Sequence, residues 1–416
     1  MASANQLISN LQGIEAGSFA SEAERVRAKD ALIEALRKVQ TPWDIAWDHN
    51  WVNGATNAAI KTLIDAGVFV KWAEAGGEPI TTAKLAELTG ADAQLLSKSI
   101  HSWRYWYIAT GFRTTNRICA GRMLRTVAGQ LLIHEVAQDT YARTPWAKAL
   151  AEDSSFPGMY GGFYHELNNP MFRTLPYYLK ETGFKNPTNV DNCNFQYWRG
   201  AGANMFQYVG TNPLLTSDFN DAMECHSKYN LTPWPEVYPT ETVIEAAKPG
   251  RPLVVDIGGG KGHDLKKFHA KHPEIPAGSL VLQDLGDILK GVEAADAIAI
   301  QPYDFFTPQP VRGSRVYFMH NVLHDWPDAT AVQILRNVAA GMEKGYSRLL
   351  VHESLVSSVK PLLRVCVSDI TMMACLAAHE RSETEWDALI SSAGLRIVKI
   401  WRPPHSVESV IEAELV

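Results

Sequence analysis

Cysteine is scarce in this chain of 416 residues, and its distribution excludes two kinds of stabilised domain. There are five cysteines, and no two of them form a C-x-x-C pair. A small, odd and scattered set argues against a disulfide framework and against a structural zinc site. The five are Cys119, Cys193, Cys225, Cys366 and Cys375. Because disulfides are rare in reducing compartments, we expect a cytoplasmic protein.

The sequence also lacks a surplus of positive charge and any long apolar run. Lys and Arg total 39 against 45 Asp and Glu, which gives a net charge of -6. A nucleic-acid-binding domain usually has a basic surplus. No run approaches the roughly 18 apolar residues of a transmembrane helix, and residues 1–17 lack the pattern of a signal peptide. We therefore expect neither a nucleic-acid partner nor a membrane partner.

The composition that remains is that of a globular protein with a large core. Hydrophobic residues make up 46% of the chain and charged residues 20%. At roughly 150 residues per domain, the length predicts two or three domains. We divide the chain into a helical part over residues 1–150, a helical linker over residues 151–235 and an α/β part over residues 236–416.

The first part carries patterns that indicate a winged-helix-like unit. Residues 20–40 place apolar side chains three and four positions apart, as in an amphipathic helix. Thr81 or Thr82 can cap a helix that ends at Gly90. Residues 131–150 alternate apolar and polar positions and lead into another helix, which fits a wing.

Two further stretches are rich in aromatic residues. Residues 99–121 also carry several arginines and lack helix caps, and we interpret them as an insertion into the winged-helix-like unit. The insertion is either an irregular excursion or a functional lid. Residues 151–235 indicate short helices joined by Gly, Asn and Pro turns. We expect most of their aromatics in the core and some in a pocket for a flat organic molecule.

From Pro249 onward, short apolar runs alternate with helical segments. Buried strands that alternate with helices are typical of a parallel, doubly wound α/β sheet. The fold class is therefore α/β, with the mostly parallel sheet in the C-terminal part.

A glycine-rich turn follows the first of these strands. The segment Asp256-Ile257-Gly258-Gly259-Gly260-Lys261-Gly262 ends a strand and opens a helix. Such a turn can be only a loop, but its position lets a ligand approach the backbone closely. Asp284 ends the next strand, where an acid suits the two hydroxyls of a ribose. In the strand after that, Asp304 can accept from an exocyclic amine while Phe305 packs on the ring, so the set predicts an adenosyl ligand.

These motifs, in this order, resemble those of a known enzyme family. The segments DIGGGKG, LQDL, YDFF, HNVLHDWPD, VHESLV and HERSETEW are similar to those of the S-adenosylmethionine-dependent small-molecule O-methyltransferases of plants and fungi. The resemblance is to the cation-independent, caffeic acid O-methyltransferase-like type. It implies a Rossmann-like class I methyltransferase domain over residues 236–416 and a dimerisation domain over residues 1–150. It also implies a homodimer, S-adenosylmethionine as cofactor, S-adenosylhomocysteine as its product, and no metal.

The resemblance assigns site residues by their place in these motifs. Those at the cofactor are Asp256, Gly258, Gly259, Gly260, Asp284, Leu285, Asp304, Phe305 and His320. Some relatives carry a lysine where this chain has His320, so the role of that histidine is open.

The catalytic base of the family falls on His324. A histidine just after a strand lies on the ligand side of an open α/β sheet, and its ordinary pKa suits proton abstraction near neutrality. Glu353 and Glu380 match the two acids that bracket the base and fix its tautomer. Asp325 resembles the residue near the reacting hydroxyl, or it caps the helix that starts at Pro327.

The sequence therefore predicts methyl transfer to a hydroxyl of a small aromatic or heterocyclic secondary metabolite. A phenol, an enol and an N-hydroxyl would all serve, and an N-acceptor stays open. The alternative is a methyltransferase-fold enzyme that catalyses dehydration or a pericyclic reaction with the cofactor bound. The histidine at the base position favours methyl transfer. A winged-helix DNA-binding regulator is disfavoured, because phosphate contacts dominate DNA affinity and the chain is acidic.

Overall fold

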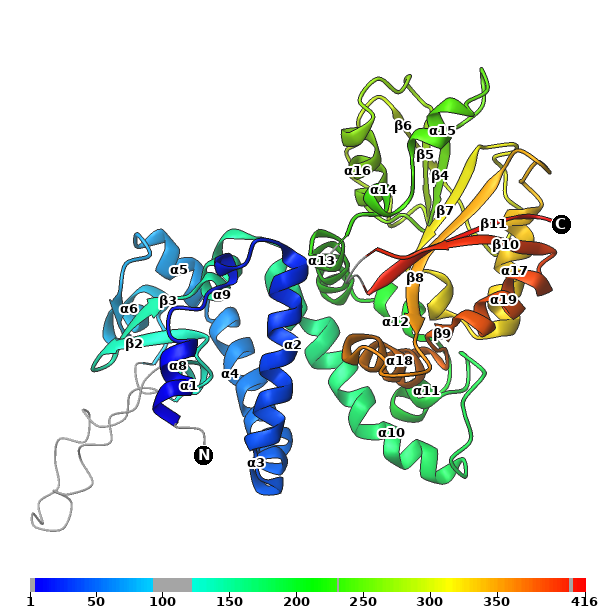
Figure 1. Cartoon of the computed structure of the whole chain (residues 1–416). Coiled ribbons are helices and arrows are strands. Elements are labelled where there is room, and N and C mark those ends of the chain that lie inside the picture. The colour runs from blue at the N-terminus through cyan, green and yellow to red at the C-terminus, as the bar shows by residue number, and fades with distance from the viewer. Residues whose placement is uncertain (1–3, 93–121, 230–231, 404–406) are drawn as a thin grey trace, which may run out of the picture. The chain divides into compact units, whose positions relative to one another are not determined.

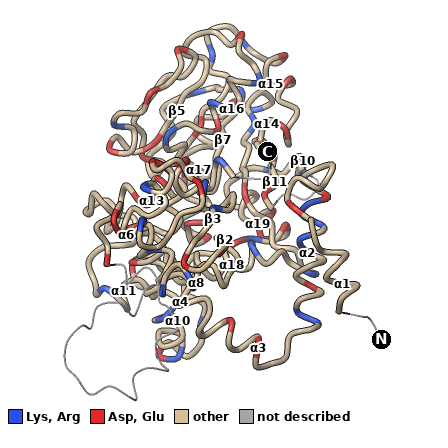
Figure 2. Tube along the Cα trace, turned by 90° about the vertical axis from the view of Figure 1, so that its left-hand side faces the viewer, with Lys and Arg blue, Asp and Glu red and all other residues tan. Residues whose placement is uncertain are grey.

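The structure is a computed structural model that describes residues 4–92, 122–229, 232–403 and 407–416. It divides into two compact units, Met1–Ala55 and Thr56–Val416. The predicted insertion at residues 99–121 lies outside the described residues, as does Cys119. No described helix is long and apolar enough to cross a lipid bilayer. Acidic and basic residues are interspersed along the described trace (Figure 2).

The first unit consists of short and long helices. They are α1 (Ala4–Leu11), η1 (Ala16–Ser18), α2 (Glu22–Val39), α3 (Pro42–Trp47) and the π-helix η2 (Asp48–Val52). The helix predicted over residues 20–40 is confirmed as α2, which begins after Ser21 because that hydroxyl accepts from the Glu24 amide. The apolar side chains of Leu32, Ile33 and Leu36 are exposed on α2.

The second unit begins with helices packed around a small antiparallel sheet of order β1-β3-β2. The elements are α4 (Asn53–Asp65), α5 (Val68–Glu74), β1 (Ile80–Thr81), α6 (Thr82–Thr89), α8 (Met123–Gly129), β2 (Ile133–Ala137), β3 (Thr140–Arg143) and α9 (Pro145–Glu152). Thr81 caps α6 and Gly90 ends it, as predicted. The hairpin of β2 and β3 followed by α9 matches the pattern expected over residues 131–150, while the winged-helix assignment stays a prediction.

Short helices then connect this part to the α/β part, as the turns in residues 151–235 predict. They are η3 (Phe156–Tyr160), the π-helix η4 (Phe163–Asn168), α10 (Asn169–Glu181), α11 (Asn194–Arg199), α12 (Met205–Gly210) and α13 (Pro213–Lys228). Their buried aromatic and aliphatic side chains share a core with α18 (Leu363–Leu376), a helix much later in the chain. The linker helices therefore pack against the C-terminal part of the chain.

The C-terminal part is an eight-stranded sheet with the main order β10-β11-β8-β7-β4-β5-β6 (Figure 1). The strands are β4 (Val254–Ile257), β5 (Leu280–Asp284), β6 (Ile298–Pro302), β7 (Val316–His320), β8 (Arg348–Val356), β9 (Arg381–Ser382), β10 (Leu395–Trp401) and β11 (Glu408–Leu415). The strands β4 to β8 pair in parallel, while β11 pairs antiparallel with β8 and β10. The predicted mostly parallel sheet is confirmed.

Helices cover both faces of this sheet, because alternate side chains of a strand point to opposite faces. The helices are α14 (Trp234–Val237), α15 (Glu241–Glu245), α16 (His263–Lys271), α17 (Asp328–Ala339) and α19 (Glu383–Ser392). On one face, Phe318 of β7 shares a core with Phe268 of α16. On the other, its neighbour Tyr317 shares a core with Ile334 of α17 and Trp386 of α19.

The strand order reverses beside β4. The chain runs outward from β4 through β5 to β6 and then returns to place β7 on the other side of β4. Open α/β sheets bind ligands at such a switch point, outside the carboxyl ends of the strands. The ends of β4 and β7 carry the glycine-rich turn and the predicted base.

Candidate active site

The glycine-rich turn has the backbone conformation that requires glycine. Gly258, Gly260 and Gly262 have φ values of +72°, +56° and +73°, which L side chains rarely adopt. A Cβ atom on Gly259 would lie 2.5 Å from the carboxyl carbon of Asp256. The turn therefore packs directly against the acid that precedes it.

Asp256 is buried in a way that leaves part of its carboxyl group unused. The side chain is 1% exposed, and its Oδ2 atom has no hydrogen-bond partner among the described residues. Burial, together with the charge of Asp264, raises the pKa of Asp256 well above its ordinary value. A buried polar atom without a partner is costly, so this oxygen suits a hydrogen-bond donor supplied by a ligand.

Asp284 joins the end of β5 to the glycine-rich turn. Its Oδ2 accepts from the Gly260 amide at 2.9 Å, and its Oδ1 accepts from the Leu285 amide at 2.7 Å. A carboxylate has about four acceptor positions, so two remain for the hydroxyls of a ribose. Burial raises the pKa of Asp284, while the two amides oppose that shift. The predicted cofactor residue Leu285 contributes its amide here, and its side chain is exposed.

The next strand brings an aromatic ring to the same place. Phe305 is half-buried and packs against Phe306 and Trp326, with ring centroids 5.0 and 6.0 Å apart. A Cβ atom on Gly258 would lie 4.0 Å from the Phe305 ring, so the ring borders the glycine-rich turn. Asp304 is exposed, and its carboxylate accepts from the Phe306 amide at 3.0 Å.

His320, the last residue of β7, has both ring nitrogens engaged. Its Nδ1 lies 2.6 Å from Asp264 Oδ2, and its Nε2 lies 3.1 Å from Glu408 Oε2. Burial alone would lower the pKa of His320, but the two carboxylates raise it well above its ordinary value. The two carboxylates thus favour a positively charged His320 at the end of β7. The sequence gave no signal for its partners, which come from α16 and β11.

The predicted base lies on a short 3₁₀ turn, η5 (Leu323–Asp325), directly after β7. The turn is entered through Asn321, which has a left-handed φ of +50°, a conformation that asparagine tolerates better than most residues. His324 Nδ1 lies 2.8 Å from Glu380 Oε1. Its Nε2 lies 3.6 Å from Asp325 Oδ1. Helix α17 begins at Asp328, and no side chain caps its N-terminus. The alternative role of Asp325 as the cap of that helix is therefore not observed.

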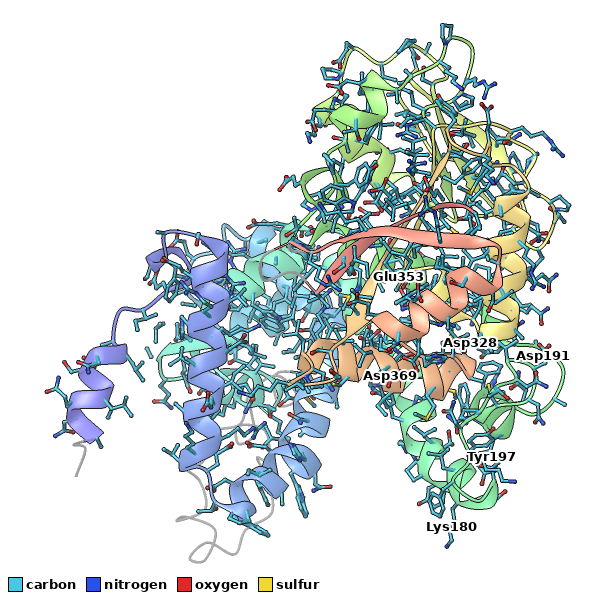
Figure 3. The ribbon with its side chains drawn as sticks, turned by 45° about the vertical axis from the view of Figure 1, so that its right-hand side comes forward. Lys180, Asp191, Tyr197, Asp328, Glu353 and Asp369 are labelled. Atoms are coloured by element: carbon cyan, nitrogen blue, oxygen red, sulfur yellow. The ribbon has the colours of Figure 1, made fainter. Side chains whose placement is uncertain are left out.

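Glu353 supports the backbone of the turn that carries the base. One oxygen, Oε1, accepts from the amides of Val322, Leu323 and His324 at 3.1, 2.9 and 3.3 Å. The other, Oε2, lies 3.8 Å from His324 Nδ1 and has no hydrogen-bond partner among the described residues. Glu353 is 0% exposed and projects from β8, where Figure 3 labels it. Glu353 therefore fixes the turn, whereas Glu380 binds the imidazole.

Glu380 is itself held by helix α18. The Ser368 hydroxyl donates to Glu380 Oε1 at 2.5 Å, and the Asp369 carboxylate accepts from the Glu380 amide at 2.9 Å. Figure 3 shows Asp369 on this helix. Burial raises the pKa of Glu380, but His324 and Ser368 outweigh burial and leave it lowered. Sequence reasoning missed both α18 residues, because a serine and an aspartate in an apolar helix carry no signal by themselves.

A buried arginine completes the support. Arg381 is 0% exposed and donates to the carbonyls of Leu323 and Trp326 at 2.9 and 2.8 Å, and to Asp328 at 2.9 Å. It thus clamps both ends of the base turn. Its position next to Glu380 in the HERS segment was the available signal.

The acids change the titration of the base. Burial alone would lower the pKa of His324, but Glu353, Asp325 and Glu380 raise it well above its ordinary value. Burial raises the pKa of Asp325 to about 7, against the opposing charge of His324. The three carboxylates therefore favour the protonated imidazole of His324, and that proton must leave before the imidazole can act as a base.

Two groups of side chains have potential metal-donor atoms within 4.8 Å of one another: His324 with Glu353 and Glu380, and His320 with His352 and Glu408. In each, a histidine nitrogen already contacts a carboxylate oxygen of the same group, at 2.8 and 3.1 Å respectively. These contacts are those of hydrogen-bonded ion pairs. We interpret both groups as charge networks, and the expected absence of a metal stays a prediction.

Comparison with known proteins shows which family this chain belongs to. Residues 178–396 match the O-methyltransferase domain family. The O-methyltransferase mfmE of Annulohypoxylon moriforme is 34% identical over 411 residues, which cover 98% of this chain and 95% of that protein. The chain belongs to the S-adenosylmethionine-dependent O-methyltransferases. The family that the sequence motifs resemble is thereby confirmed.

Solved structures extend the likeness of this O-methyltransferase to the fold. The structure of LepI in complex with S-adenosylmethionine has a TM-score of 0.83 and 24% identity, and covers 99% of this chain and 98% of that chain. A pericyclic reaction enzyme has a TM-score of 0.84 and 24% identity with the same coverage. At this identity, these likenesses concern the fold of the O-methyltransferase and not its reaction.

The residues at the switch point fit the cofactor of the family. The free oxygen of Asp256, the remaining acceptor positions of Asp284 and the ring of Phe305 lie around one glycine-rich turn. Of the predicted cofactor residues in this O-methyltransferase, His320 is the exception, because both its ring nitrogens are engaged by protein carboxylates.

Proposed function

We propose that this O-methyltransferase methylates a hydroxyl of a small aromatic or heterocyclic secondary metabolite, with His324 as the general base. The observation that carries the proposal is the hydrogen bond between His324 Nδ1 and Glu380. Because Nδ1 is hydrogen-bonded to that carboxylate, Nε2 is the ring nitrogen that can take a proton from the substrate hydroxyl. This is the orientation that a carboxylate gives to a catalytic histidine in other enzymes.

When bound, S-adenosylmethionine supplies a methyl group on a positively charged sulfur. We assign the ribose hydroxyls to Asp284, the adenine to Asp304 and Phe305, and a donor group of the cofactor to the free oxygen of Asp256. His324 would take the proton from the acceptor hydroxyl, and Glu380 would stabilise the imidazolium that forms. The methyl group would pass to the acceptor oxygen as its bond to sulfur breaks, which would leave S-adenosylhomocysteine. The enzyme then contributes mainly positioning and a base of the right tautomer.

A second candidate reaction is dehydration or a pericyclic rearrangement with the cofactor bound. The similarity to a pericyclic reaction enzyme favours keeping it. The complete set of base, orienting acid and turn-fixing acid favours methyl transfer over a pericyclic rearrangement, since a pericyclic step needs no proton acceptor.

Domain organisation, assembly and compartment complete the proposal. We propose that residues 1–150 form a winged-helix-like dimerisation domain, residues 151–235 a linker that lines the acceptor pocket and residues 236–416 the catalytic domain of a homodimer. The exposed apolar side chains of α2 support dimerisation. The described cysteines, Cys193, Cys225, Cys366 and Cys375, are free thiols, which supports a reducing, cytoplasmic compartment.

The experiment that tests the reaction is mass spectrometry of a metabolite library incubated with the enzyme and S-adenosylmethionine labelled in its methyl group. Methyl transfer predicts a product that gains one labelled methyl. A product that loses one water would identify a dehydratase, and an isomer of unchanged mass would identify a pericyclic enzyme. Either of those products, formed without any labelled product, would overturn the proposal.

A further inference from the structure

The glycine-rich turn has one side chain by which the rest of the protein can hold it. In the stretch from Gly258 to Gly262, Lys261 is the only residue that is not glycine, and glycine loses more conformational freedom on ordering than other residues. The amides of Gly258 and Gly259 donate to the Gln283 carbonyl at 2.8 and 3.1 Å, so β5 holds the first half of the turn. The second half can be held through a side chain only at Lys261.

The side chain of Lys261 extends from the turn to helix α13. Its Nζ atom lies 3.0 Å from Glu224 Oε2 and 3.8 Å from Asp221 Oδ1. The two acids are three positions apart in α13, so they lie on one face of that helix. The Glu224 side chain is 18% exposed and that of Lys261 39%. Burial raises the pKa of Glu224, but the hydrogen bonds from Lys228 and Lys261 outweigh burial and leave that pKa lowered, which favours the carboxylate.

Further contacts keep α13 in place, so Lys261 is bound to a fixed element. Glu224 Oε1 lies 2.9 Å from Lys228 Nζ, and the same Nζ lies 3.1 Å from Asp153 Oδ1 at the C-terminal end of α9. On the side of α16, Lys267 Nζ donates to the Ser227 carbonyl at 2.8 Å. Helix α13 is therefore tied both to α9 and to the helix that follows the turn.

The charges around Lys261 argue against direct contact of its ammonium group with the cofactor. Two carboxylates, those of Glu224 and Asp221, already face that group. The other cationic groups at Glu224 are Lys228, at 2.9 Å, and the ring of His263, whose Nε2 lies 3.9 Å from Glu224 Oε2. The charge of Lys261 is thus compensated within the protein, as in a residue that holds the turn.

We propose that Glu224 is a positioning residue of the cofactor site, which holds the glycine-rich turn through Lys261 in the conformation that receives S-adenosylmethionine. The inference rests on the assignment of the cofactor to this turn and not on the identity of the acceptor. A turn that is already ordered loses little freedom when the ligand binds, so the ion pair strengthens binding without touching the cofactor.

Isothermal titration with S-adenosylhomocysteine tests the proposal in Glu224→Gln, in Lys261→Met and in the double variant. We expect each single substitution to weaken binding by about 3- to 10-fold, between the effects of an exposed ion pair and of a buried charged hydrogen bond. The double variant should lose no more than either single variant, because all three lack the same pair. Lys261→Arg should keep most of the affinity, since its guanidinium can still bind the carboxylate.

Steady-state kinetics on any acceptor that is methylated provides a second readout. The KM for S-adenosylmethionine should rise in Glu224→Gln by a similar factor, while kcat stays native because neither member of the pair contacts the base. The matched control is Glu241→Gln. Glu241 pairs with Lys271 Nζ at 2.9 Å, at the opposite end of α16, so this substitution breaks a pair of the same kind away from the turn and should leave the affinity native.

Native affinity in Glu224→Gln would overturn the proposal, even if Lys261→Met bound more weakly, because Lys261 would then contact the cofactor itself. Losses that multiply in the double variant would overturn it as well, since the two residues would act independently. Asp284→Ala separates this inference from the cofactor assignment. Weaker binding in Asp284→Ala but not in Glu224→Gln would leave the assignment intact and remove the role of Glu224. Native affinity in both variants would overturn both. The titration needs no acceptor, so it decides the role of Glu224 even if no metabolite is methylated.

Discussion

His324 Nδ1 lies 2.8 Å from Glu380 Oε1, and Ser368 donates to the same oxygen at 2.5 Å. Glu380 is thus shared between the base and α18. Glu353 instead uses its bonded oxygen for three backbone amides. Two acids that look equivalent in the sequence therefore support the base in different ways, and their variants should behave differently.

Replacing the base should stop turnover without loss of the cofactor. We expect His324→Ala to lower kcat by about 10²- to 10⁴-fold, the usual contribution of a positioned acid-base group. Isothermal titration with S-adenosylhomocysteine should give the native affinity, because the proposed role of the ring is at the acceptor and not at the cofactor. A variant with full turnover would remove the base assignment and would indicate an acceptor that is already ionised.

The two glutamates should separate stability from catalysis. Glu353→Ala leaves three buried amides without an acceptor, so we expect a loss of at least about 1–3 kcal/mol in the free energy of unfolding. Urea unfolding measures this loss, with Glu383→Ala, on the surface of α19, as a control that should stay within about 0.5 kcal/mol. Glu380→Gln should mainly lower kcat, and its loss in the free energy of unfolding should be smaller than that of Glu353→Ala. If the two substitutions lowered kcat by the same factor and the free energy of unfolding by the same amount, this division of roles would be contradicted.

The pH dependence of the rate should reveal the carboxylates around the base. Because Glu353, Asp325 and Glu380 raise the pKa of His324, the protonated, inactive form persists above the ordinary value of about 6.5. The rate should therefore rise with pH through a pKa above that value and then level off.

Removing one carboxylate should shift that profile in a defined direction. In Glu380→Gln the charged form of His324 loses a partner, so its pKa falls and the rising limb moves to lower pH. The profile of kcat against pH for both proteins measures the shift. A limb that moves to higher pH, or does not move, would show that Glu380 does not control the base.

The ribose assignment predicts a loss of cofactor affinity at Asp284. Asp284→Ala removes a charged acceptor, and we expect S-adenosylhomocysteine to bind more weakly by about 1–3 kcal/mol. The matched control is Asp287→Asn, an exposed acid three residues later that pairs with Lys290. Native affinity in Asp284→Ala would exclude the assignment.

The proposed homodimer predicts that charge on α2 disrupts assembly. Leu32→Glu combined with Leu36→Glu places two acids on its apolar stripe, and sedimentation at micromolar concentration should then report a monomer where the native protein is a dimer. Arg27→Glu changes charge on the opposite side of the helix, where Arg27 is exposed, and should leave the dimer intact. A monomeric native protein would contradict the proposal.

Local patterns were sufficient for much of the fold. The helix at α2, the cap of α6 by Thr81, the hairpin of β2 and β3 and the alternation of strands and helices after Pro249 all follow from periodicity and capping. These features depend on residues a few positions apart, so one sequence contains the information. The glycine-rich turn is of the same kind, because its positive φ angles require glycine.

Contacts between distant segments were decided only by the tertiary structure. The sequence by itself determined that His324, Glu353 and Glu380 belong to one site, through motifs that resemble those of a family. It did not determine that Glu380 binds the imidazole while Glu353 binds the backbone, or that Ser368 lies on Glu380. Hydrogen-bond partners depend on distances of a few tenths of an ångström between elements far apart in the chain, and those distances are set by how the whole core packs.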